Sequence, residues 1–330
     1  MTREVTNKAL EPSLLRFLWR TLSIPQAGPE ISDRIVAFDS ETLERQPVGK
    51  QSVVDEFLSL KNTRAAKVVE DLPASDDGTL DPKAVDRLLI TAHCEMQRIS
   101  EEFQHGRRVA ELLNSILEAL RANRVSRPLR VVDIGCGTGF VIRWLAANNS
   151  LGDDVELIGA DYHPALIEEA TRLAREEKLS CRFVIGNAFR LSQPAAVYVS
   201  TGILHHFRGA DLVKLFSQSD RPSTCAFLHF DFHSSALAPF GSWLFHAVRM
   251  REPLAKHDGV LSAVRAYAPR ELLLAARTGA PDFVSAIYGT KLWGLPIPRA
   301  FHSLVGIRPQ YRNAFIANMG SKIGSLGVIE

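Results

Sequence analysis

The chain has 330 residues, with 39 Lys and Arg against 37 Asp and Glu, and 46% of its residues are hydrophobic. This length allows one large domain or two modest ones with a substantial buried core. The formal net charge of +2, without any block of like charges, favours a small neutral or mildly acidic substrate over nucleic acid or a membrane surface.

The amino terminus and the cysteines both bear on the compartment. The amino-terminal residues are charged and polar, and no apolar run reaches the roughly 18 residues that a membrane span requires. The four cysteines are far apart, with neither a Cys-x-x-Cys pair nor a spacing typical of zinc. We therefore expect a cytoplasmic protein with reduced thiols, no structural metal and no membrane partner.

Residues 1–127 carry mainly helical patterns. Asp81 can cap, and Pro82 can open, a helix that runs to Phe103, because its apolar residues recur at spacings of three and four. Gly106 is expected to end or kink this helix. The remaining expectations in this region are helices over residues 14–22, 53–60 and 109–120, and an exposed loop over residues 73–78.

From residue 128 to residue 330 short apolar runs alternate with helical patterns, which is typical of strand-helix-strand units around a mostly parallel sheet. A long irregular stretch is expected from His233 to Arg265. Seven strands are predicted over residues 129–134, 155–161, 181–185, 196–201, 225–230, 283–288 and 303–307. Helices are predicted over residues 141–147, 164–177, 210–217 and 269–277. The fold class is therefore α/β, with a Rossmann-like seven-stranded sheet preceded by a helical cap.

The turn after the first of these strands reads Gly135-Cys136-Gly137-Thr138-Gly139. Three glycines at alternate positions let the backbone turn sharply and approach a ligand closely. A dinucleotide fold usually has Gly-x-Gly-x-x-Gly, and here the final position is Phe140. The Gly-Lys-Ser/Thr ending of a phosphate-binding Walker loop is absent from this turn.

The segment from Val131 to Gly139 resembles the first motif of the class I (Rossmann-like) S-adenosylmethionine-dependent methyltransferases, small-molecule type. The resemblance implies S-adenosylmethionine as the cofactor, with its methionine part on the loop formed by Gly135, Cys136, Gly137 and Gly139. It also implies that Asp133 lies near the cofactor ammonium. The chemistry agrees, because this cofactor carries two positive groups and no phosphate.

Further cofactor contacts are expected after the next two strands, since ligands of parallel sheets bind at the carboxyl ends of strands. Asp161 can accept hydrogen bonds from both ribose hydroxyls. Tyr162 is expected to stack near the adenine. Asn187 and Ala188 resemble the adenine-contacting segment of the family, where Asp is commoner than this Asn.

The fourth strand leads through Thr201, which we count among the cofactor-binding residues, into Leu204-His205-His206. This stretch resembles one found in small-molecule methyltransferases, including those of quinone biosynthesis. His205 or His206 titrates near neutrality and can accept a proton from the methyl acceptor. The alternative is that the histidines only form hydrogen bonds in the loop and shape the pocket.

Other polar candidates are Asp231, His233 and the segment Lys256-His257-Asp258-Gly259, for which a solvated turn is favoured over a loop above the acceptor. The aromatic residues between Phe240 and Phe245 either line a substrate pocket or pack in the core, and Arg249 and Arg251 are expected in solvent.

The acceptor is expected to be a small aromatic, quinone-like or polyketide-like molecule, with O-methylation first and C-methylation next. The segment after the fourth strand lacks the Asn/Asp-Pro-Pro-Tyr/Phe typical of enzymes that methylate nucleic-acid amino groups. Residues 1–127 are expected to cover the acceptor, to form a homodimer, or both. The alternatives are a protein or RNA methyltransferase that docks its substrate on this region, a non-catalytic cofactor-binding module, and an NAD-dependent oxidoreductase.

Overall fold

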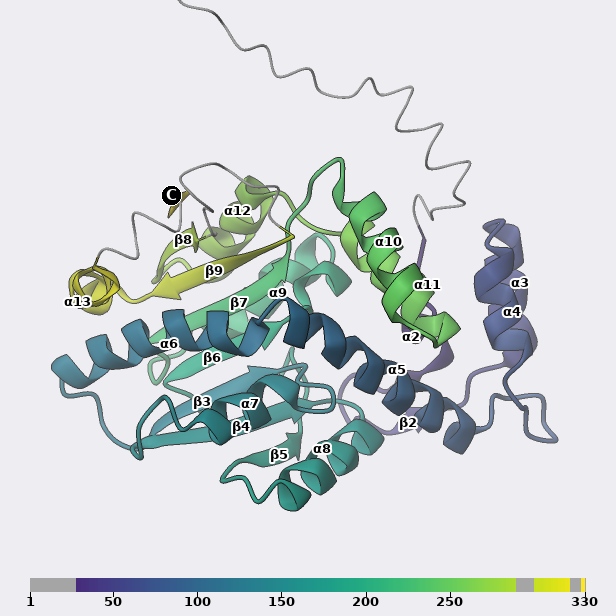
Figure 1. Ribbon diagram of the computed structural model, residues 1–330, viewed down its shortest axis with the longest axis horizontal. Coiled ribbons are helices and arrows are strands. Elements are labelled where there is room, and N and C mark those ends of the chain that lie inside the picture. Colours follow the sequence, from purple (N-terminus) through teal and green to yellow (C-terminus); the bar gives the residue numbers. More distant parts are fainter. Residues whose placement is uncertain (1–27, 289–299, 321–327, 330) are drawn as a thin grey trace, which may run out of the picture.

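The computed structural model describes residues 28–288, 300–320 and 328–329, so the helix expected over residues 14–22 lies outside the described residues. A central sheet organises the fold (Figure 1). Its strands are β3 (Leu129–Ile134), β4 (Val155–Asp161), β5 (Arg182–Ile185), β6 (Val197–Thr201), β7 (Ala226–Phe232), β8 (Val284–Tyr288), β9 (Phe301–Ile307) and β10 (Val328–Ile329). The seven expected strands are all present, with bounds that differ by at most two residues, and β10 adds an eighth.

The strand order is β10-β8-β9-β7-β6-β3-β4-β5. Neighbours from β7 through β5 run parallel, whereas β9 is antiparallel to both β7 and β8. The order reverses beside β3, because β4 lies on one side of it and β6 on the other. Ligands of such sheets bind at the carboxyl ends of the strands where this reversal occurs. The expected Rossmann-like sheet is therefore confirmed.

Helices cover both faces of the sheet, because successive residues of a buried strand point to opposite faces. Val131 packs in one core with α6, and Val132 packs in a second core with α9 and α12. The helices that follow the start of the sheet are α7 (Phe140–Asn148), α8 (Pro164–Glu176), α9 (Ala210–Ser219), α10 (Ala238–Arg249), α11 (Pro253–Val264), α12 (Pro269–Gly279) and α13 (Pro309–Met319), with a short 3-10 turn η1 (Leu204–His206).

The described part of the region before residue 128 is mainly helical, as expected. It contains α2 (Ser32–Ile35), α3 (Lys50–Ser59), α4 (Thr63–Glu70), α5 (Pro82–Glu102) and α6 (His105–Ala122), with a small hairpin of β1 (Ala37–Phe38) and β2 (Arg45–Gln46). Asp81 caps α5 by accepting the N–H of Ala84 at 2.7 Å. The helix break falls at Gln104, whose φ is 54°, and not at Gly106, which lies in the first turn of α6.

The expectation of an irregular stretch from His233 to Arg265 is wrong, because α10 and α11 occupy most of it. These helices pack on each other, and α11 also packs on α4 and α5. Figure 1 shows α10 and α11 with α3, α4 and α5 beyond the carboxyl ends of the parallel strands. A helical layer built from two distant parts of the sequence thus lies over the end of the sheet where a ligand is expected. None of the helices in the described ranges is long and apolar enough to cross a membrane.

Candidate functional site

The glycine turn joins β3 to α7 at the point where the strand order reverses. Gly135, Gly137 and Gly139 have φ values of 68°, 54° and 75°, a region that favours glycine. Space is also limited there, because a Cβ on Gly139 would lie 2.3 Å from the ring of Phe183. Gly135 and Cys136 both donate their N–H groups to the carbonyl oxygen of Ala160, at 2.8 and 3.1 Å. The loop is therefore held against the end of β4, as a ligand-binding turn requires.

Asp133, on β3 just before this turn, has a buried carboxylate oxygen without a hydrogen-bond partner among the described residues. Burial and the nearby charge of Asp161 raise the pKa of Asp133 well above its usual value. The hydroxyl of Thr201, the last residue of β6, is also buried without a partner among the described residues. Unpartnered buried oxygens are rare in folded proteins, and a bound ammonium would satisfy such a carboxylate.

Asp161 ends β4 beside the glycine turn. Its Oδ2 accepts the N–H of Gly137 at 2.9 Å, and its Oδ1 accepts the N–H of His163 at 3.0 Å. A carboxylate has about four acceptor positions, so both oxygens keep capacity for the two hydroxyls of a ribose. The structure places Asp161 and the loop together, as the cofactor hypothesis requires.

The expected adenine-contacting residues lie beside the cap. Tyr162 packs edge-on against Phe38 of the β1–β2 hairpin, with ring centroids 5.3 Å apart. The amide of Asn187 donates to the carbonyl oxygen of Ser40 at 2.6 Å, and its oxygen accepts the N–H of Phe189 at 2.8 Å. Ala188 lies partly buried between these residues. The contact of this segment with adenine stays a prediction.

Helix α5 supplies His93, which the sequence reasoning missed, and Gln97, which belongs to the polar helix end that the sequence favours as a cover over the cofactor. His93 lies so close to the glycine turn that a Cβ on Gly137 would be 2.7 Å from its Cδ2. Its Nδ1 is bonded to the carbonyl oxygen of Leu89 at 2.8 Å. Gln97 accepts from Arg143 of α7 at 3.1 Å. No local motif marks His93, and only its place on the helix expected to lie near the cofactor offered a signal.

His205 and Asp231 form a buried pair at the carboxyl ends of β6 and β7. His205 Nδ1 lies 2.8 Å from Asp231 Oδ1, and the N–H of His205 donates to Asp231 Oδ2 at 3.2 Å. Burial raises the pKa of Asp231, but the charge and hydrogen bond of His205 outweigh that effect and lower it. The carboxylate therefore fixes the orientation of the imidazole and leaves Nε2 directed toward Glu30, whose Oε1 is 3.8 Å away.

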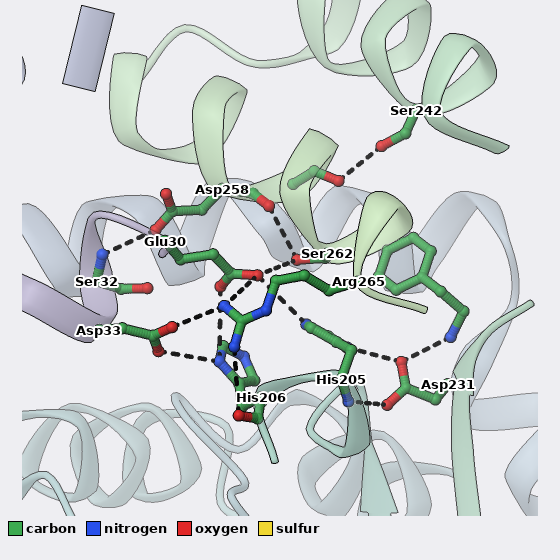
Figure 2. A network of polar contacts seen from close by, with 12 residues as sticks. Glu30, Ser32, Asp33, His205, His206, Asp231, Ser242, Asp258, Ser262 and Arg265 are labelled. Atoms are coloured by element: carbon green, nitrogen blue, oxygen red, sulfur yellow. Dashed lines mark hydrogen bonds and ion pairs between the residues drawn. The ribbon is translucent and has the colours of Figure 1, made fainter. Parts of the chain in front are cut away.

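His206 faces a second polar group that the sequence reasoning missed (Figure 2). Its Nδ1 lies 3.1 Å from Asp33 Oδ1 and 3.6 Å from Glu30 Oε2. Arg265 binds Asp33 Oδ2 at 2.7 Å. Burial alone would lower the pKa of His206. The charges of Glu30 and Asp33, with the hydrogen bond to Asp33, instead raise this pKa to about 9. Burial raises the pKa of Glu30.

A cavity of about 620 Å³ opens beside this cluster, with His206, Asp33 and Arg265 in its wall. Its other lining residues are Gly28, Pro29, Arg34, Arg208 and Val264. The cavity is large enough for a small organic molecule. Of the two histidines, His206 lines it, whereas His205 lies buried behind.

The remaining polar candidates have structural partners. The expectation of a solvated turn at Lys256–Gly259 is wrong, because these residues lie inside α11. Asp258 accepts the N–H groups of Ile31 and Ser32 at 2.8 and 2.9 Å, and His257 lies 2.7 Å from Asn62. These distant partners explain how polar residues remain buried in a helix.

The other candidate residues near the insertion, meaning the helices α10 and α11 between β7 and α12, lie in different environments. Arg249 and Arg251 are exposed, as expected, and Arg249 pairs with Glu102 of α5. Phe240 and Leu244 are exposed on α10, whereas Phe245 packs against Phe103. His233 lies 3.0 Å from His302, which pairs across β9 and β7 with Asp231.

Comparison with known proteins identifies part of the chain. Residues 131–221 match a family described as "Methyltransferase domain". The demethylmenaquinone methyltransferase of Deinococcus radiodurans is 34% identical over 82 residues, which are 24% of this chain and 32% of that protein. The match therefore spans about a third of the curated relative's length.

Solved structures are less similar in sequence. The plantazolicin methyltransferase BpumL, in complex with SAH, is 14% identical over 78% of this chain and 99% of its own, with a TM-score of 0.49. Magnesium protoporphyrin IX methyltransferase from Synechocystis PCC 6803, with bound SAH, is 17% identical over 78% of this chain and 99% of its own, with a TM-score of 0.40. The family match, together with the sheet order and the glycine turn, shows that residues 131–221 form a class I, S-adenosylmethionine-dependent methyltransferase domain.

Proposed function

We propose that the protein transfers the methyl group of S-adenosylmethionine to a small-molecule acceptor, with a hydroxyl oxygen as the first choice and an acidic carbon as the second. One observation carries this proposal: the glycine turn, Asp161 and the unpartnered carboxylate of Asp133 meet at the carboxyl edge of the sheet. The site thus offers acidic and backbone groups to a cationic nucleoside ligand.

The roles of the cofactor residues follow from these positions. Asp133 receives the ammonium group, and the turn from Gly135 through Gly139 surrounds the methionine part. Asp161 accepts from the ribose hydroxyls while it holds the turn through Gly137. Tyr162, Asn187, Ala188 and Thr201 complete the cofactor pocket. When bound, S-adenosylmethionine supplies a methyl carbon already activated by the sulfonium, so the protein chiefly orients the acceptor and excludes water.

The acceptor occupies the cavity beside His206, which is lined by residues between 28 and 34 of the amino-terminal region and by Val264 at the end of α11. In this proposal residues 1–127 form the cap over the acceptor. His205 and His206 activate the acceptor by promoting loss of its proton. The relative from Deinococcus radiodurans supports a quinone-like or other hydroxylated aromatic acceptor, because that protein is a demethylmenaquinone methyltransferase. A homodimer through the amino-terminal region belongs to the same proposal.

Calorimetry with S-adenosylmethionine and with NAD tests the cofactor. We expect binding of the first and none of the second, and a preference for NAD would contradict the proposal. Transfer of a radiolabelled methyl group to a panel of phenols, quinols and acidic carbon compounds then tests the acceptor class. Labelling of none of them, in a protein that binds the cofactor, would contradict the acceptor class but not the cofactor.

Once an acceptor is identified, His205→Gln and His206→Gln test whether the two histidines activate it. We expect kcat to fall by about 10²- to 10⁴-fold in at least one variant, with a changed pH profile. His246→Gln is the matched control, because Nδ1 of His246 lies 2.7 Å from the carbonyl oxygen of Ser242 within α10. Unchanged kcat and pH profile in both variants would exclude these histidines from acceptor activation.

A further inference from the structure

Glu30, His205 and His206 bring three metal-binding side chains to one place. One ligand atom from each lies within 4.8 Å of the other two. The residues come from parts of the chain that are distant in sequence, since Glu30 precedes α2 and the histidines form η1 after β6 (Figure 2). The sequence expectation of no metal rested on local spacing, which such a cluster does not display.

The charges around this cluster leave an excess of negative charge. The carboxylates of Glu30, Asp33 and Asp231 all lie within 4 Å of an imidazole nitrogen of His205 or His206. Arg265 compensates one of them, because it binds Asp33 at 2.7 Å and approaches Glu30 at 3.4 Å. Two negative charges remain once an incoming ion has displaced the proton that His206 shares with Glu30 and Asp33, and a divalent cation would balance them.

The side chains behind the cluster are arranged as around metal ligands. Asp231 accepts from His205 Nδ1, which leaves Nε2 directed toward Glu30. Ser262 donates its hydroxyl to Glu30 Oε1 at 3.1 Å. Histidine ligands almost always donate their second ring N–H to a carboxylate or carbonyl, and ligating carboxylates are themselves hydrogen-bonded. The pair of His205 and Asp231 therefore presets the tautomer that a metal requires.

We propose that Glu30, His205 and His206 bind a divalent transition-metal ion such as Zn²⁺ or Co²⁺. Two imidazoles and one carboxylate suit these ions better than Mg²⁺, which prefers an all-oxygen octahedral site. Ligand bonds of about 2.0–2.2 Å separate neighbouring ligand atoms by about 3.0–3.5 Å. His206 Nδ1 lies 3.6 Å from Glu30 Oε2, and His205 Nε2 lies 3.8 Å from Glu30 Oε1, so the two carboxylate oxygens each need only a small contraction toward a shared ion. Nδ1 of His206 would then exchange its contact with Asp33 for the ion.

The role of the ion deepens the proposed function and rests on it. Three protein ligands leave a coordination position open, and His206 places that position at the cavity wall. An acceptor hydroxyl there loses its proton to solvent more readily, because the ion stabilises the resulting oxyanion. That oxygen then attacks the methyl carbon while the carbon–sulfur bond breaks and the neutral thioether leaves. In this form of the mechanism the histidines act as ligands and the ion activates the acceptor.

Metal binding is measured on the full chain after treatment with a chelator and dialysis. Calorimetry with Zn²⁺ and visible absorption with Co²⁺ are expected to show one ion per chain, and Mg²⁺ to give no comparable heat. Glu30→Gln and His206→Gln are expected to weaken Zn²⁺ binding by at least about 10-fold, because loss even of a residue that only hydrogen-bonds a metal ligand costs about 10- to 100-fold. His246→Gln, which changes a histidine bonded within α10, should bind Zn²⁺ as the parent protein does.

The outcomes separate the two proposals. Absence of stoichiometric Zn²⁺ binding, or unchanged binding in both Glu30→Gln and His206→Gln, overturns the metal site. Circular dichroism and S-adenosylmethionine affinity of each variant, expected to match the parent protein, show that any loss is not one of folding. If Zn²⁺ binds with this dependence while S-adenosylmethionine does not bind, the proposed function fails and the metal site stands.

Discussion

Gly137 donates its backbone N–H to Oδ2 of Asp161 at 2.9 Å, so the cofactor loop and the end of β4 are joined by one side chain. Oδ1 of the same carboxylate accepts the N–H of His163. Asp161 therefore holds the loop against the end of β4, and we propose that it also receives the ribose of the cofactor. Removal of the Asp161 carboxylate should therefore weaken binding of S-adenosylmethionine, both by releasing the loop and by removing an acceptor for the ribose.

Asp161→Ala is expected to raise the Kd for S-adenosylmethionine by at least about 10-fold, because hydrogen bonds to a charged group each contribute about 1.5–3 kcal/mol. Asp161→Asn keeps one acceptor oxygen, so its Kd for S-adenosylmethionine should lie between those of Asp161→Ala and the parent protein. Calorimetry measures both. Equal affinity in Asp161→Ala and the parent protein would show that the ribose lies elsewhere.

Two glycines in neighbouring helices form a matched pair. A Cβ on Gly259 of α11 would lie 1.9 Å from Nε2 of the buried His246, whereas a Cβ on Gly241 of α10 would meet nothing within 4 Å. Gly241→Ala should raise the free energy of unfolding by about 0.5–1 kcal/mol, because alanine favours helix. Gly259→Ala should lower it by about 1–3 kcal/mol through overpacking. Urea denaturation measures the free energy of unfolding of both variants. A gain in stability from Gly259→Ala would contradict the packing of α10 on α11.

Asp258 connects α11 to the start of the described chain. It accepts the backbone N–H groups of Ile31 and Ser32, and Ile31 is fully buried. Asp258→Ala leaves both donors unpaired, which costs about 1–3 kcal/mol for each buried group. We expect faster hydrogen exchange at Ile31 and Ser32 and a lower free energy of unfolding, with a smaller effect in Asp258→Asn. Unchanged exchange at both amides would mean that this contact does not hold the amino-terminal segment.

His105 makes stability depend on pH. Its ring lies buried among Phe103, Phe230 and Phe301, and neither ring nitrogen has a hydrogen-bond partner among the described residues. Burial lowers the pKa of His105 to about 3, with a smaller contribution from the positive charge of Arg108. The folded state thus favours the neutral ring. Its contribution is fully present above about pH 6.5, the usual pKa of histidine, and is lost as the pH falls toward 3.

His105→Phe removes this proton uptake without removing a hydrogen bond. Below the usual pKa of histidine, the free energy of unfolding of the parent protein should fall by up to about 1.4 kcal/mol more per pH unit than that of the variant. Urea denaturation at several pH values between about 7.5 and 5 measures the two slopes. Equal slopes would show that His105 can take up a proton within the folded protein.

Local sequence patterns predicted the elements that depend on neighbouring residues. The bounds of β3 and β4 agree with the expected ranges, because apolar runs bounded by turn residues mark buried strands. The start of α5 was also predicted, since Asp81 and Pro82 form a local cap. The insertion of α10 and α11 was missed, because α11 is buried around most of its circumference and carries no clear polar face.

The sequence by itself determined the methyltransferase domain, since the strand, the glycine turn and the acid after the next strand are short-range features whose order specifies the cofactor edge. Only the tertiary structure decided which groups meet the histidines of η1. Asp33 reaches His206 across 173 positions, and Asp258 reaches Ile31 across 227. Such contacts depend on how the cap and the insertion pack over the sheet, and no local spacing encodes that packing. The acceptor side of the site is therefore set by side chains that burial forces to find partners far along the chain.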